Sequence, residues 1–173
     1  MPTTITVEQL RATEACRDAA RRYSRGVDRL DRDEMRSAYW PEAVDEHGCF
    51  VGNAWEFVDY CMTGHDKWLS TMHLIANHTV ELDDDGAHAR GEVYNVSILR
   101  RADEDLLDVW VGRYLDTYER RGEEWRILHR VCVHEHDLTV DAATPMPISA
   151  VAFLQGSFDR PADGRPLGPP SDD

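Results

Sequence analysis

The chain has 173 residues, 42% of them hydrophobic and 5 of them tryptophan, which is enough apolar material for one continuous core. Its 33 acidic residues outnumber its 19 basic ones and give a formal net charge of −14. A surface of this sign repels nucleic-acid phosphates and anionic lipid headgroups, so we expect neither as a partner. No apolar run approaches the roughly 20 residues of a membrane span, and the N-terminus lacks the basic and apolar regions of a signal peptide.

The cysteines Cys16, Cys49, Cys61 and Cys132 are widely separated, and no C-x-x-C motif occurs. Disulfide scaffolds are short and rich in cysteine, and zinc ribbons need paired spacing, so the sequence indicates neither. We therefore expect a reduced, cytoplasmic protein.

The N-terminal part has the spacing of amphipathic helices. Thr4 or Thr6 is a candidate cap for a first helix, whose apolar side chains recur at three- and four-residue steps from Ala12 to Leu30. A second, short helix is expected over Asp33–Tyr39, ending near Pro41.

Two weaker patterns follow before the chain changes character. The segment Val44–Val51 alternates poorly and predicts a weak strand or hairpin. Asn53 is a candidate cap for a third helix over about Ala54–Trp68.

From Ser70 onward the hydrophobic period is two, which predicts long strands over 70–83, 87–101, 106–121 and 124–138. Short polar connections separate them, so the strands should form an antiparallel meander. Helices followed by long strands predict an α+β fold with the helices on one face of a curved sheet. We expect one domain over 1–140, followed by a Pro/Gly-rich tail over 141–173 that docks on a pocket or on a neighbouring subunit.

The last predicted strand has two different faces. Its alternation places Trp125, Ile127, His129 and Val131 on one face, and Arg130, Cys132, His134 and His136 on the other. The second face either lines a polar cavity or meets solvent, and periodicity leaves both readings open. His134 and His136 share that face without a third ligand, so we expect no metal site.

The strand 70–83 contains two histidines. Alternation places His73 beside Asn77, as in a lined pocket, whereas His78 lies among apolar neighbours, as expected of a hydrogen-bonded core histidine. A histidine base works best with a carboxylate on its second ring nitrogen, and the candidate carboxylates are Asp28 and Asp31. A helical wheel places Asp28 in solvent, so periodicity alone does not select the pair.

Several of these residues together resemble a known family. Tyr23-x-x-x-x-Asp28, then YWPEAVDEHG (39–48), then His73, and then GRYLDTYERRGEEWRILHR (112–130) are similar to the SnoaL-like family of the nuclear transport factor 2-like, or cystatin-cone, superfamily. The resemblance covers about residues 7–138. It groups the chain with scytalone dehydratase, bile acid 7α-dehydratase and hexachlorocyclohexane dehydrochlorinase.

The resemblance implies a curved sheet closed into a cone by three helices, with the active site inside. It also implies a cofactor-independent elimination. His73 matches the catalytic base, Asp28 its orienting carboxylate, and Tyr23 the tyrosine of the dehydratases. The dehydrochlorinase has lysine at the Tyr23 position, so the match favours dehydration.

The resemblance also suggests substrate-binding residues. Arg130 matches a pocket arginine, and His134 falls where the bile acid enzyme carries an arginine, a departure that argues against a bile acid substrate. Asn95 is a further candidate for polarising a substrate carbonyl. Trp40 and Trp110, with Tyr114, are candidate apolar walls, although each is also compatible with ordinary core packing.

The expected function is a lyase, most simply a dehydratase, acting on a hydroxylated cyclic or steroid-like small molecule. An isomerase, a polyketide cyclase and a non-catalytic binding protein of the same fold are the alternatives, because one fold supports many functions. Relatives are often trimers or dimers, so we expect a homo-oligomer, with a trimer favoured.

Overall fold

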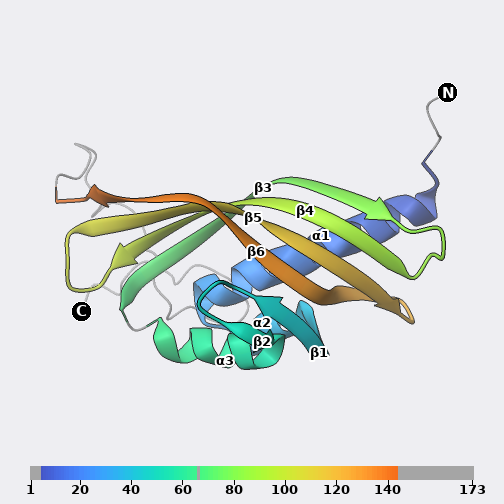
Figure 1. Cartoon of the computed structure of the whole chain (residues 1–173), viewed down its shortest axis with the longest axis horizontal. Coiled ribbons are helices and arrows are strands. Elements are labelled where there is room, and N and C mark those ends of the chain that lie inside the picture. Colours follow the sequence, from blue (N-terminus) through green and yellow to red (C-terminus); the bar gives the residue numbers. More distant parts are fainter. Residues whose placement is uncertain (1–4, 66, 144–173) are drawn as a thin grey trace, which may run out of the picture.

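The computed structural model describes residues 5–65 and 67–143, and these form helices packed on one face of a curved sheet (Figure 1). The helices are α1 (Val7–Arg29), α2 (Arg32–Ser37) and α3 (Ala54–Gly64). The strands are β1 (Tyr39–Glu46), β2 (Val51–Asn53), β3 (Trp68–Leu82), β4 (His88–Arg101), β5 (Leu106–Arg121) and β6 (Glu124–Asp141). The predicted α+β class is confirmed.

Local signals set the helix boundaries. Thr6 caps α1 in a capping box with Gln9, in which each side chain accepts a hydrogen bond from the other's backbone N–H. The helix ends at Leu30, which adopts a left-handed conformation with φ of 50°. Asp31 then caps α2 and Asn53 caps α3, so each short polar residue between elements begins a new helix.

Gly26 fixes how α1 meets α2. A Cβ atom added at Gly26 would lie 2.5 Å from the backbone nitrogen of Met35 and 2.6 Å from its Cα. Only glycine permits this approach, so the residue that weakens α1 as a helix former also holds the α1–α2 corner together.

The six strands form one open sheet in the order β2-β1-β6-β5-β4-β3. Strands β3 to β6 pair as the predicted antiparallel meander. Strand β1 lies parallel to β6 and antiparallel to β2, which the weak alternation over 44–51 did not reveal. In Figure 1 the long helix α1 crosses the concave side of the sheet, with α2 and α3 beside it.

The predicted boundaries need three corrections. The second helix ends at Ser37 because Tyr39, fully buried, already belongs to β1. The third helix ends at Gly64 because Trp68 begins β3, and β6 extends to Asp141. The tail predicted over 141–173 lies outside the described part of the chain except for residues 141–143, so its docking stays a prediction.

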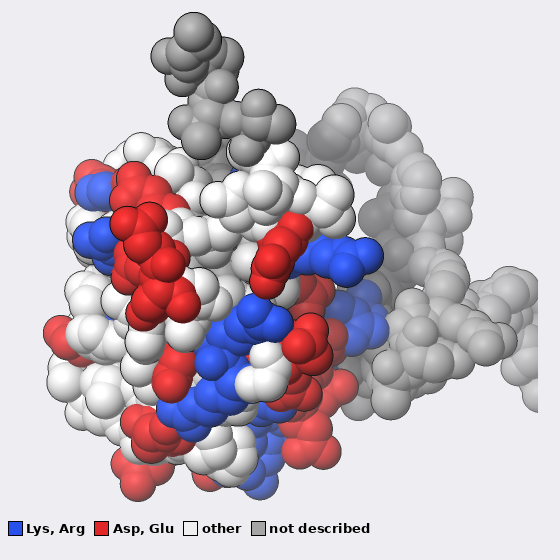
Figure 2. Space-filling model, turned by 90° about the vertical axis from the view of Figure 1, so that its right-hand side faces the viewer, with Lys and Arg blue, Asp and Glu red and all other residues white. Residues whose placement is uncertain are grey.

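Charged side chains of both signs share the surface. Figure 2 shows acidic and basic side chains next to one another on one face. Surface ion pairs such as that of Arg126 with Glu124 join side chains of opposite charge. Such pairs each add little to stability, so the packing of helices on the sheet stabilises the fold. None of the described helices is long and apolar enough to cross a membrane.

Candidate active site

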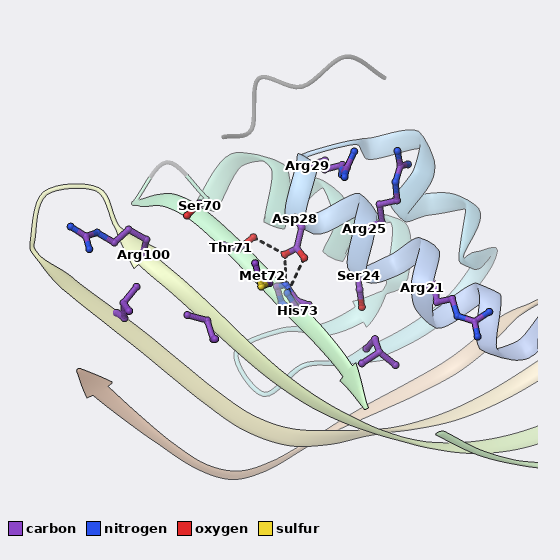
Figure 3. A pocket seen from close by; sticks show the side chains of 13 residues that line it. Arg21, Ser24, Arg25, Asp28, Arg29, Ser70, Thr71, Met72, His73 and Arg100 are labelled. Carbon is purple, nitrogen blue, oxygen red and sulfur yellow. Dashed lines mark hydrogen bonds and ion pairs between the residues drawn. The ribbon is translucent and has the colours of Figure 1, made fainter. Parts of the chain in front are cut away.

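A histidine and an aspartate meet between α1 and β3. The Asp28 Oδ1 lies 2.6 Å from His73 Nδ1, and Asp28 Oδ2 accepts a hydrogen bond of 2.8 Å from the His73 backbone N–H. Thr71 donates its hydroxyl to Asp28 Oδ1 at 2.9 Å (Figure 3). Three hydrogen bonds therefore hold the carboxylate, and no residue in the described part of the chain hydrogen-bonds Nε2 of His73.

The position of Asp28 on the helix explains why the helical wheel misplaced it. The inner stripe of α1 faces the sheet, whereas one flank, which carries Ser24 and Asp28 one turn apart, faces β3. The Asp28 side chain is only 19% exposed and that of His73 only 10%. Burial alone would raise the pKa of Asp28, but the bonds and charge of His73, together with the Thr71 hydroxyl, lower it, so the carboxylate is ionised at neutral pH.

His73 lies between two hollows. On the outer side, an open groove of about 560 Å³ follows α1 and β3 and has Asp28, Thr71 and His73 in its wall (Figure 3). On the inner side, a cavity of about 380 Å³ lies between the sheet and the helices. Its wall is largely aromatic and includes Tyr23, Phe57, Tyr60, Trp68, Trp110 and Tyr114.

Three other predicted site residues reach this inner cavity. Tyr23, Trp110 and His134 line it together with His73. The Tyr23 ring stands edge-on to His73 with centroids 6.5 Å apart. Burial and the neighbouring Tyr114 and Tyr39 raise the pKa of Tyr23 well above its ordinary value, so its hydroxyl stays protonated and is a hydrogen-bond donor.

Arg130 does not line the cavity, contrary to the expected role in substrate binding. Its side chain has no exposed surface and binds Asp116 through two contacts of 2.7 Å. The guanidinium also stacks on Tyr114 at 4.1 Å and on Tyr23 at 4.3 Å. Arg130 therefore supports the aromatic wall from behind.

Asn95 and Trp40 also lie away from the cavity wall. The Asn95 amide donates to Ser97 Oγ at 2.8 Å, and Ser97 itself lines the cavity. Trp40 donates its indole N–H to the backbone of Glu119 and lies under Arg121 and Arg126, at an outer corner of the fold. Direct substrate contact is therefore not supported for Trp40, and Asn95 borders the cavity through Ser97.

Irregularities in two strands explain which side chains point inward. In β6, Tyr118 pairs with Ile127 and Thr117 with His129, so Leu128 is an extra residue that switches the alternation. Trp125 and Ile127 thereby share the inner face with Arg130, although simple alternation separated them. A second irregularity lies at Glu135, so His136 turns to the opposite face from His134, and the predicted shared face is wrong.

Strand β3 has a similar irregularity. Ile75 pairs with Asn95 and His78 with Val93, so Ala76 and Asn77 together oppose only Tyr94. Asn77 is therefore exposed, and His78 turns inward on the same face as His73. His78 Nε2 lies 3.2 Å from the Tyr118 hydroxyl, which agrees with the expected hydrogen-bonded core histidine.

The sequence did not single out several cavity residues. His47 and Phe57 stack with centroids 4.4 Å apart, and both face the cavity, as does His65. His47 follows β1 directly, so the parallel pairing of β1 with β6 would have indicated its position. A histidine held by an ionised aspartate at the wall of an aromatic cavity is suited to removing a proton from a bound organic molecule.

The comparisons with known proteins agree with this architecture. Residues 8–131 match the model of the SnoaL-like domain, and a search of curated proteins gives no match. A type 2 hexachlorocyclohexane dehydrochlorinase has a similar solved structure, with a TM-score of 0.72 and 16% identity over 82% of this chain and 97% of that one.

Two further solved structures are similar. A candidate scytalone dehydratase from Novosphingobium aromaticivorans has a TM-score of 0.69 and 18% identity, over 84% of this chain and 99% of that one. A nuclear transport factor 2-like protein from Salmonella enterica has a TM-score of 0.63 and 16% identity, over 72% of this chain and 92% of that one. Since the domain match extends from the first helix into the last strand, the chain belongs to the SnoaL-like family, and its fold is similar to that of the nuclear transport factor 2-like protein.

Proposed function

We propose that the protein is a small-molecule lyase in which His73 removes a proton from carbon and Asp28 stabilises the resulting imidazolium. The observation that supports this most directly is the 2.6 Å contact between His73 Nδ1 and Asp28 Oδ1 at the wall of an aromatic cavity. The contact fixes the tautomer, so Nε2 is the nitrogen available to accept a proton.

The charge balance of the site favours proton abstraction. Asp28 is ionised at neutral pH, and its charge offsets the one that forms on His73 when the base takes a proton. The Tyr23 hydroxyl stays protonated and is a suitable donor to a substrate oxygen. General base catalysis of this kind typically contributes about 10²–10⁴-fold to the rate.

The reaction we favour is an elimination, most simply a dehydration. Two of the similar structures carry names of eliminating enzymes, a dehydrochlorinase and a candidate scytalone dehydratase. The cavity volume of about 380 Å³ is near the lower end of the range for drug-sized ligands, about 300–1,000 Å³. This size favours a hydroxylated substrate of one or two rings over a steroid.

The test is a screen of hydroxylated cyclic carbonyl compounds for ultraviolet absorbance from a newly conjugated alkene. With an active compound, His73→Ala and Asp28→Asn should each lower kcat by about 10²-fold or more. His88→Asn is the matched control, because His88 and Asp85 form a 2.6 Å pair on the exposed β3–β4 turn, far from the cavity lining.

Circular dichroism should show that all three variants keep the wild-type fold. Near-wild-type rates in both site variants would refute the His73–Asp28 mechanism. Proton exchange into the substrate without loss of water would favour an isomerase, and tight binding without turnover would favour a binding protein. The expected cytoplasmic location and homo-oligomeric state stay predictions.

A further inference from the structure

The histidine of a second histidine–aspartate pair, His47, lines the same cavity as His73. His47 Nδ1 lies 2.9 Å from Asp45 Oδ1, and Asp45 Oδ2 accepts a hydrogen bond of 2.6 Å from the Tyr39 hydroxyl. The Asp45 side chain has no exposed surface, whereas that of His47 is 20% exposed. The buried carboxylate is thus held at both oxygens and presents His47 to the cavity.

The surroundings of the His47 ring fix its direction. The ring stacks on Phe57 with centroids 4.4 Å apart and an interplanar angle of 22°. The centroid of the Tyr23 ring lies 6.3 Å from that of His47 and 6.5 Å from that of His73, so both histidines are neighbours of Tyr23. No described residue hydrogen-bonds Nε2 of either ring, and each histidine has its Nδ1 on an aspartate.

The two pairs are built on unrelated parts of the chain. Asp28 and His73 come from α1 and β3, at one edge of the sheet, whereas Asp45 and His47 lie in and just after β1, beside β6. The pairs share neither a carboxylate nor a strand, so each histidine has its own counter-charge. Two separate groups of this kind are the arrangement that an acid and a base acting on one substrate require.

We infer that His47 is the general acid that protonates the leaving oxygen while His73 acts as the base; this inference rests on the proposed elimination. His73 Nε2 takes the proton from carbon, and the C–H electron pair becomes the new C=C bond. The C–O bond breaks, and its electron pair leaves on the oxygen, which receives the proton from Nε2 of the His47 imidazolium. Alkene and water depart, and solvent returns the proton from His73 to His47.

Leaving-group dependence distinguishes an acid from a base. Hydroxide leaves slowly without a proton, whereas chloride leaves without one. The experiment uses two β-substituted aryl ketones that differ only in this group. His47→Asn should slow loss of water by about 10²-fold and loss of chloride by less than about threefold. His73→Asn should slow both about equally, and His88→Asn should change neither.

Three kinetic outcomes would overturn the assignment. In the first, His47→Asn slows the elimination from both ketones equally. In the second, His47→Asn slows neither reaction. In the third, the wild-type enzyme eliminates chloride but not water. If the wild type turns over neither ketone nor any compound of the screen, the proposed lyase function fails instead.

A measurement without turnover tests the placement of His47 in that case. Phenol, an oxygen-bearing aromatic probe, should shift the imidazole ¹⁵N signals of both His47 and His73 and leave that of His88 unchanged. A titration in which only His73 responds would overturn the inference.

Discussion

The buried pair of Arg130 and Asp116 should be a major and strongly coupled contribution to stability. Neither side chain has exposed surface, and two contacts of 2.7 Å join them. Removing one partner leaves the other charge in a dry environment, which typically costs about 3–5 kcal/mol. We therefore expect Asp116→Asn to lower the free energy of unfolding by about this amount.

Arg130→Met should cost more than Asp116→Asn. In addition to leaving Asp116 without its partner, it removes the guanidinium from the faces of Tyr114 and Tyr23. A desolvated cation–π contact contributes about 2 kcal/mol. In the double variant Asp116→Leu/Arg130→Met neither member of the pair is left charged without its partner, so the loss should fall to about 2 kcal/mol, which is mainly the stacking contribution.

Urea unfolding followed by tryptophan fluorescence, at one fixed protein concentration, measures these differences. Asp83→Asn is a suitable control, because Asp83 forms an exposed pair with Arg90 at 3.3 Å and should change stability by less than about 1 kcal/mol. Single variants that each lose less than about 1 kcal/mol, or a double variant whose loss equals their sum, would refute the reasoning.

Three further predictions concern other parts of the fold. Gly26→Ala should destabilise the protein by about 1–3 kcal/mol, because the added Cβ would clash with Met35. Gly64→Ala should be close to neutral, because the space around Gly64 is open. Equal melting temperatures of the two variants would contradict this prediction. Burial lowers the pKa of His78 from 6.5 to about 4. As the pH drops, the unfolded chain therefore binds a proton at this histidine before the folded protein does, and the stability of the protein should fall between about pH 6.5 and pH 4. In acid-unfolding curves the His78→Asn variant should lose less stability over this window than the wild type, and an equal loss would exclude the mechanism. The outer face of the sheet exposes five large apolar side chains, those of Met72, Leu74, Tyr94, Leu115 and Leu138. Light scattering should therefore show a homo-oligomer, and Leu74→Glu should dissociate it. A monomeric wild-type protein would contradict this prediction.

The sequence predicted the fold better than it predicted the site. Long alternating strands and polar turns specify the meander, and capping residues specify the helices, because these signals are local. Strands β1 and β6 pair although they are far apart in the sequence, and the weak alternation over 44–51 did not indicate this pairing. His47 was missed for this reason.

Strand irregularities account for most of the other differences. One extra residue at Leu128 reverses the side chains of β6 that follow it, as far as the second irregularity at Glu135. Alternation in the sequence does not show where such an extra residue lies. His73 was placed correctly because it precedes the irregularity in β3, whereas Asn77 lies within it. The burial of Asp28 could not be predicted without β3, since a helical wheel describes one helix without its neighbours.

The contacts of α1 along β3 also bear on self-association. Strand β3 is an edge strand of fifteen residues, and long open edges invite pairing with another chain. Asp28 occupies the backbone N–H of His73 on this edge, and Arg17 occupies the backbone carbonyl of His78. The carboxylate that orients the proposed base therefore also blocks a position where a second strand would add, and Asp28 variants should be watched for fibrils and domain-swapped dimers as well as for lost turnover.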